Sequence, residues 1–188
     1  MTRLATSAPA AAPASSNWLK RYYSMRAAVS ILWVALAFTI GKSQPAIATV
    51  LLIAYPLWDS IANYIDAMHS GGLRVNPTQF LNTVVSGVVT AAVIVTIQHD
   101  FHTAIGVIGV WAALSGLLQL STAVRRWRKV SAQWPQILSG VQSAAAGAHF
   151  IIQAAAPSQP LSVAIVAPYA AFGAVYFAIS AGVLAFKR

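Results

Sequence analysis

One otherwise apolar segment of the chain carries four polar residues at helical spacing. They recur at intervals of four, four and three residues and so fall on one face of a helix: Tyr55, Asp59, Asn63 and Asp66. Asp59 lies seven residues from Asp66, which is about 10 Å along a helix rising 1.5 Å per residue. An ionisable side chain inside a membrane span costs about 2.5–3.5 kcal/mol on insertion scales, so it is a functional candidate that faces protein or water.

Two interpretations of this polar stripe are open. In the first, Asp59 with Tyr55 and Asn63 lines a proton- or solute-binding cavity open to the cytoplasm. In the second, Asp59 and Asp66 form ion pairs with arginines at the cytoplasmic edge and lock the bundle. The candidate partners are Arg26, Arg125 and Arg126. An Asp59 that faces the bundle axis with no arginine in reach would favour the cavity.

A second polar cluster, His99, Asp100 and His102, occupies a short predicted loop. Histidine titrates near pH 6.5, so the cluster is a candidate sensor of external acidification. Three donors in so short a loop are a weak pattern for a metal, and we predict no metal site. A polar turn is the favoured interpretation. His149 lies in the fifth apolar stretch and could reach the same region, and His69 is expected in a loop.

No catalytic motif accompanies these residues. The chain contains no cysteine, no Gly-rich phosphate loop, no HExxH and no GxSxG. Both aspartates of the apolar stretches lie on one segment, whereas a paired-aspartate protease needs them on two. We therefore expect a non-enzymatic protein with no cofactor and no catalytic residue.

The composition predicts an integral membrane protein. Of the 188 residues, 58% are hydrophobic and only 8% are charged, against about 25% charged residues in soluble domains. The formal charge is +9, but long uncharged apolar runs are not a feature of nucleic-acid-binding proteins. The expected partner is the lipid bilayer, and no nucleic acid.

Six apolar stretches predict an all-α fold of six transmembrane helices, because about 17–25 residues cross the hydrocarbon of a bilayer. They cover residues 25–41, 45–66, 80–98, 103–124, 134–156 and 161–186. Residues 1–17, rich in Ala, Pro and Ser, predict a disordered cytoplasmic tail. Residues 18–188 then form one transmembrane domain.

Basic residues predict the orientation of these spans. With six spans and both termini in the cytoplasm, eleven of the twelve Lys and Arg residues lie inside and only Lys42 lies outside. This matches the positive-inside rule of a bacterial cytoplasmic (inner) membrane. The basic stretch 125–129 then adjoins the anionic headgroups.

The even-numbered spans align with one another. Tyr55, Trp111 and Tyr169 occupy matching positions, separated by 56 and 58 residues, and among the odd spans Ser86 matches Ser139 at a separation of 53. We infer three helical hairpins related by a parallel repeat. Small residues four apart, such as Gly140 and Ala144, predict close helix packing within the monomer, with a homo-oligomer through these faces as the alternative.

Two segments resemble the HdeD-like family of small bacterial inner-membrane proteins: GVWAALSGLLQLSTAVRRWRK and WPQILSGVQSAAAG. The resemblance is best over residues 104–147 and implies a role in acid resistance, with no catalytic residues to carry over. The second span, YPLWDSIANYIDA, departs from the family pattern. The sequence therefore predicts a non-enzymatic protein of acid or envelope stress tolerance. The alternative is a small solute or proton transporter or channel with its polar site on the second span.

Overall fold

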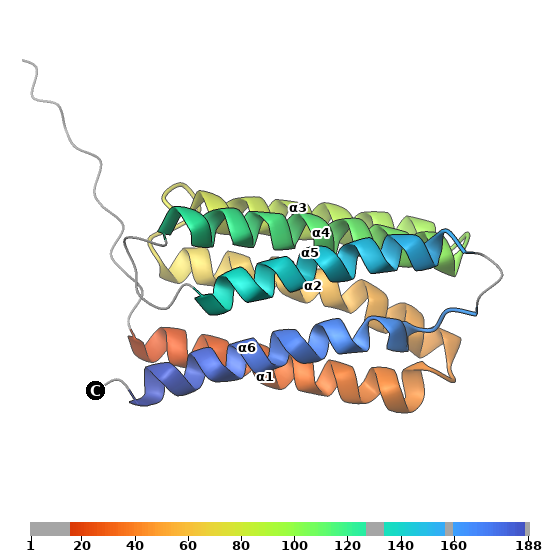
Figure 1. Cartoon of the computed structure of the whole chain (residues 1–188), viewed down its shortest axis with the longest axis horizontal. Helices are drawn as coiled ribbons and strands as arrows, with labels where there is room; N and C mark the ends of the chain where they lie inside the picture. Colours follow the sequence, from red (N-terminus) through yellow and green to blue (C-terminus); the bar gives the residue numbers. More distant parts are fainter. Residues whose placement is uncertain (1–15, 127–133, 157–159, 187–188) are drawn as a thin grey trace, which may run out of the picture.

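The computed structural model describes residues 16–126, 134–156 and 160–186 as a bundle of long helices (Figure 1). The long helices are α1 (Ser16–Leu36), α2 (Pro45–His69), α3 (Pro77–Thr96), α4 (Phe101–Arg126), α5 (Trp134–Ala154) and α6 (Ala167–Phe186). A π-helical turn, Ala37–Gly41, continues α1, and a 3₁₀ turn, Val163–Ile165, precedes α6. The described residues contain no strand, so the all-α prediction is confirmed for them.

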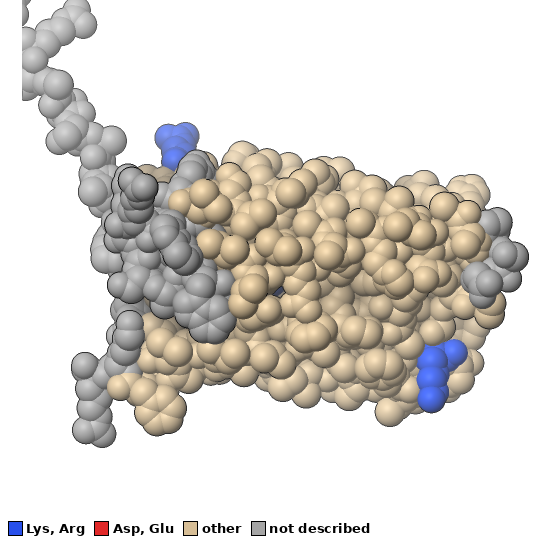
Figure 2. All heavy atoms as spheres, viewed as in Figure 1, with Lys and Arg blue, Asp and Glu red and all other residues tan. Residues whose placement is uncertain are grey.

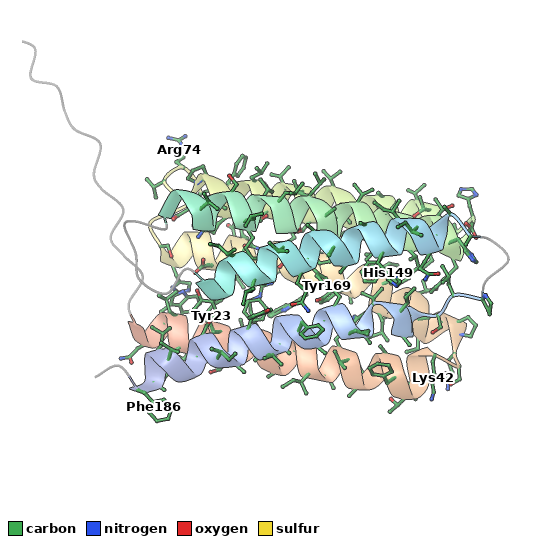
Figure 3. All side chains as sticks on the ribbon, viewed as in Figure 1. Tyr23, Lys42, Arg74, His149, Tyr169 and Phe186 are labelled. Carbon is green, nitrogen blue, oxygen red and sulfur yellow. The ribbon has the colours of Figure 1, made fainter. Side chains whose placement is uncertain are left out.

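Successive helices run in opposite directions along the long axis of the bundle (Figure 1). The beginning of α1 and the end of α6 therefore lie together, at what we call the terminal end. The connections α1–α2, α3–α4 and α5–α6 lie at the opposite, far end. Arg74 and Lys42 mark the terminal and far ends respectively (Figure 3).

Local signals fix several helix boundaries. Pro45 and Pro77 begin α2 and α3. The N–H of a first helical residue makes no hydrogen bond within the helix, so a proline there costs none. Gly71 and Gly72 follow α2 with φ angles of 97° and 93°, a left-handed conformation that favours glycine.

Several helix boundaries differ from the sequence prediction, among them the start of α1 and the end of α2. Helix α1 begins at Ser16, so the basic and aromatic residues before residue 25 are helical, as are the last two residues of the predicted tail. The rest of that tail, residues 1–15, lies outside the described residues. The prediction that His69 lies in a loop is wrong: it is the last residue of α2, and its ring stacks on Trp18 with centroids 3.6 Å apart.

The closest packing crosses the boundaries of the predicted hairpins. Helix α2 packs most extensively on α3, α4 on α5, and α6 on α1, while α1–α2 and α5–α6 touch little. Each close pair thus joins an even helix to the odd helix that follows it, and the α6–α1 pair closes the ring.

Glycines allow the closest of these contacts, between α4 and α5. A Cβ added at Gly116 would lie 2.5 Å from the Ala144 nitrogen, and one at Gly147 would lie 2.5 Å from the Ala113 nitrogen. Real Cβ atoms do not approach backbone this closely, so only glycine fits. The small-residue face predicted on α5 is therefore used inside the monomer.

The exterior of the bundle is apolar. Large hydrophobic side chains are exposed along it, among them Val88, Leu117 and Ile152, and the broad face between the ends carries almost no charge (Figure 2). Among the residues that the structure describes, five stretches are long and apolar enough to cross a membrane: Asn17–Gly41, Pro45–His69, Pro77–Thr96, Phe101–Ser121 and Ala167–Phe186. An apolar exterior on such helices fits a lipid environment, as expected of an all-α membrane protein.

Candidate functional site

A polar cavity of about 370 Å³ lies among all six helices, in the half of the bundle nearest the terminal end. All four residues of the predicted stripe line it: Tyr55, Asp59, Asn63 and Asp66. Their positions on α2 place Tyr55 deepest and Asp66 nearest the terminal end. The helical spacing therefore predicted correctly that these four side chains share one face.

Asp59 forms an ion pair with Arg26 in the cavity wall. Its second oxygen, Oδ2, accepts hydrogen bonds from Ser86 Oγ at 2.9 Å and from Asn63 Nδ2 at 3.0 Å. The Arg26 guanidinium also donates to the Tyr22 hydroxyl at 3.1 Å and lies 4.3 Å from the centroid of the Phe177 ring. The two charged side chains are 13% and 17% exposed.

Each of the two interpretations of the stripe is therefore met only in part. The predicted pairing of Asp59 with an arginine is confirmed for Arg26, and the same pair lines a cavity. The condition that we set for the cavity, an Asp59 with no arginine in reach, is not met. A paired aspartate does not by itself exclude a cavity, because the ion pair involves only two of the polar side chains that line the wall.

An aromatic triangle closes the inner end of the cavity. Tyr55, Trp111 and Tyr169, the three residues that the repeat aligns, contact one another edge to face. Their centroids are 5.4 to 6.2 Å apart and their planes meet at 80° to 86°. This is a favoured geometry for aromatic pairs. Tyr169 lies midway along the bundle (Figure 3).

Serines on α3 and α5 form hydrogen bonds with two of these aromatic side chains. Trp111 Nε1 donates to Ser86 Oγ at 2.9 Å, and the Tyr169 hydroxyl lies 3.1 Å from Ser143 Oγ, which donates to the Ala112 carbonyl. Ser86 is therefore equivalent to Ser143. The sequence match of Ser86 with Ser139 is wrong by one helical turn; Ser139 and Ser143 both line the cavity.

Asp66 differs from Asp59 in its partners. Its Oδ2 accepts one hydrogen bond, from Gln79 Nε2 at 3.3 Å, and its Oδ1 is buried without a partner. No salt bridge to Asp66 occurs within the part of the chain that the structure describes. The side chains of Arg125 and Arg126, two predicted partners, lie outside that part.

Three further buried polar atoms of the cavity lining have no hydrogen-bond partner. They are Arg26 Nε, Trp58 Nε1 and Ser115 Oγ. Buried polar atoms of folded proteins are nearly always satisfied by protein or by water. Together with Asp66 Oδ1, these atoms have almost no accessible surface, so they lie behind the cavity surface rather than on it.

The predicted outer-loop residues lie at the far end, away from the cavity, but the placement of His102 in a loop is wrong because it lies in the first turn of α4. Asp100 precedes α4 and caps it, because Asp100 Oδ2 accepts from the backbone N–H and the hydroxyl of Thr103, both at 2.8 Å. The Thr103 hydrogen bonds lower the pKa of the Asp100 carboxyl, and His102 Nδ1 lies 3.7 Å from Asp100 Oδ1. His99 lies in the turn before α4.

His149 is exposed on α5 beside Phe150. It lies nearer the far end than the terminal end (Figure 3). Among the described residues, no three His, Asp or Glu side chains are placed to hold a metal ion.

Sequence reasoning missed the part of the lining contributed by the odd helices. On α3, Gln79 and Asn82 line the cavity, and on α5, Gln142 does so and accepts from the Tyr176 hydroxyl at 3.1 Å. The signal was available: Gln79, Asn82 and Ser86 recur at intervals of three and four residues in an apolar segment. That is the same rule that identified the stripe on α2.

Comparison with known proteins finds no matching family model, no similar curated protein and no similar solved structure. The family resemblance of residues 104–147 therefore remains a proposal, and the function is argued from the site.

Proposed function

We propose that this chain is a six-span transporter of a small polar solute in a bacterial cytoplasmic membrane. The observation that carries the proposal is the polar cavity inside a bundle with an apolar exterior. Polar side chains are costly within a membrane, and those that persist there face a cavity or one another and mark solute or ion pathways. A volume of about 370 Å³ is within the range of small-molecule sites.

The proposed orientation has both termini in the cytoplasm. Among the described residues outside the cavity, Lys20, Arg21 and Arg74 belong to segments at the terminal end and Lys42 to the far end. The positive-inside rule then makes the terminal end cytoplasmic. In this orientation the cavity faces the cytoplasm, and the aromatic triangle separates it from the outside.

Transport requires that the same site be reached from both sides. The far half of the bundle is filled with apolar side chains, including the fully buried Leu52, Val93 and Ile105. In our proposal the structure is the cytoplasm-facing state. The outward-facing state arises when the aromatic triangle separates.

The absence of cysteine makes a single-cysteine labelling experiment direct. In inverted membrane vesicles, a membrane-impermeant thiol reagent should label Ser139→Cys, because that partly exposed position lines the cavity. The control Val88→Cys, exposed to lipid on α3, should not react, because a thiol in hydrocarbon does not ionise. A panel of small solutes of every charge type is then screened for protection, and a protecting solute is tested for uptake into proteoliposomes.

The proposal would be overturned in either of two ways. Ser139→Cys could be no more reactive than Val88→Cys, which would mean that water does not reach the cavity. Alternatively, no solute of any charge type could slow the labelling or enter the proteoliposomes.

A role in acid or envelope stress tolerance is a second proposal, supported by the family resemblance and by the His99–His102 loop at the far end. In the orientation proposed here this loop faces outward. The test is survival of a deletion strain at acidic and at neutral pH, complemented with the wild-type chain or with Asp59→Asn. Equal survival of the deletion strain and its parent at acidic pH would contradict the role.

A further inference from the structure

The described lining of the cavity carries three charged residues: Arg26, Asp59 and Asp66. Arg26 and Asp59 neutralise each other as an ion pair, which leaves one unbalanced negative charge, that of Asp66. Building on the proposed solute site, we propose that its solute is a small organic cation with N–H donors, a protonated amine or a guanidinium compound. Its charged nitrogen binds Asp66, and the remainder extends into the cavity.

The geometry of Asp66 fits such a partner. Oδ1 is buried without a hydrogen bond, and Oδ2 has only the long contact of 3.3 Å with Gln79. A carboxylate removed from water without a partner is strongly disfavoured. A cation with N–H donors supplies the missing charge and the missing hydrogen bonds, and charge-assisted bonds of this kind are about twice as strong as neutral ones.

The guanidinium of Arg26, by contrast, is unsuited to an anionic solute. One of its terminal nitrogens donates to Asp59 and the other to the Tyr22 hydroxyl, and its face lies over Phe177. An anion would have to displace Asp59 from Arg26 and would leave that aspartate unpaired. It would also enter past Asp66, which has no counter-charge among the described residues.

The size of the cavity indicates what else the solute carries. Its volume of about 370 Å³ exceeds what a bare ammonium ion would fill. The polar atoms Trp58 Nε1, Arg26 Nε and Ser115 Oγ have almost no accessible surface, so they do not define the solute. The inferred solute is thus an organic cation larger than ammonium.

Four two-carbon probes of nearly equal size separate the possible charges. Ethanolamine is a cation at pH 7, ethylene glycol is neutral, glycolate is an anion and glycine is a zwitterion. Each is titrated against the rate of thiol labelling of Ser139→Cys in the full-length protein. We expect ethanolamine to slow labelling at the lowest concentration, at least tenfold below the other three.

Variants of the acidic residues test whether the protection by ethanolamine depends on Asp66. Asp66→Asn should raise the ethanolamine concentration needed for protection at least tenfold, and Asp66→Glu should restore much of the effect. The matched control is Asp100→Asn, which removes the acid at the far end and should leave the titration unchanged. Asp66→Ser carries the same expectation as Asp66→Asn, should the asparagine variant not fold.

Better protection by glycolate, glycine or ethylene glycol would overturn the inference while leaving the solute site itself intact. Ethanolamine protection that survives Asp66→Asn and Asp66→Ser would overturn it as well. Failure of all four probes and of the wider solute panel would instead count against the proposed function. The two failures are therefore distinguishable.

Discussion

The two halves of this bundle are built from the same six helices but differ in what those helices turn toward the axis. On α2, Leu51 and Leu52 are buried in the far half, whereas Asp59 and Asn63 line the cavity in the terminal half. Tyr55 lies between the two sets and belongs to the aromatic triangle. The difference shows that the site is created by a change of side-chain polarity along a continuous helix face.

The halves also differ in the forces that hold them together. In the far half, apolar side chains dominate, and inside a bilayer these act mainly through van der Waals packing; the close glycine contacts of α4 with α5 occur in both halves. In the terminal half, an ion pair and its hydrogen bonds link α1, α2, α3 and α4 through Arg26, Asp59, Ser86 and Trp111. Such a polar network depends on every member, because removal of one leaves the others unsatisfied.

The largest effect should come from breaking the ion pair. Arg26→Met leaves Asp59 without its charge partner and should lower the free energy of unfolding by about 3–5 kcal/mol, the usual cost of breaking a buried pair. The double variant Arg26→Met/Asp59→Asn removes both charges and should recover most of the loss. Unfolding by SDS titration of the purified protein measures both, and a double variant no more stable than the single one would contradict the role of the pair.

The far half should be most sensitive at its glycines. Gly147→Ala places a Cβ about 2.5 Å from backbone of α4, and overpacking of this kind costs about 1–3 kcal/mol. Gly182→Ala is the matched control, because a Cβ at that helical position meets nothing within 4 Å. Alanine is the better helix former by about 1 kcal/mol, so the control should be neutral or stabilising. Equal effects at the two sites would mean that α4 and α5 do not approach this closely.

The sequence predicted what depends on local pattern. The spacing of Tyr55, Asp59, Asn63 and Asp66 placed them on one helix face, and the repeat matched Tyr55 with Trp111 and Tyr169. Helix periodicity determines the first fact, and similarity between segments of the chain determines the second. That the three matched rings meet at one point depends on how six helices pack, which no single segment encodes.

The sequence could not predict which of several similar residues makes a given contact. Three arginines were available to Asp59, and the selection of Arg26, 33 residues away, depends on which helices become neighbours. The match of Ser86 with Ser139 followed a similar local motif, V-S-G against L-S-G. The hydrogen bonds to Trp111 and Tyr169 instead identify Ser143 as the equivalent residue.

A smaller effect is expected at the boundary between the halves, where the aromatic triangle can be altered ring by ring. Trp111→Phe keeps an aromatic ring but loses the hydrogen bond to Ser86, and it should cost about 0.5–1.5 kcal/mol. Tyr169→Phe loses the contact with Ser143 and should cost a similar amount. Tyr55→Phe is the control, since Tyr55 contributes ring contacts to the triangle. A loss in the control as large as in Trp111→Phe would show that the serine hydrogen bonds contribute nothing.

The smallest effect is expected at Asp100, which caps α4 at the outer edge of the far half. The pKa of Asp100 is lowered in the folded protein by its hydrogen bonds with Thr103. A carboxyl with a lowered folded-state pKa stabilises the fold above its unfolded-state pKa, about 3.9 for aspartate, and the stabilisation is lost as pH falls through the folded-state value. Because asparagine also caps helices, Asp100→Asn should remove only the contribution of the charge. Melting temperatures of the two proteins should therefore differ at pH 5 to 7 and converge below about pH 4. A difference that instead changes between pH 5 and 8 would indicate that His99 and His102 control this end, as the pH-sensing interpretation of the loop requires.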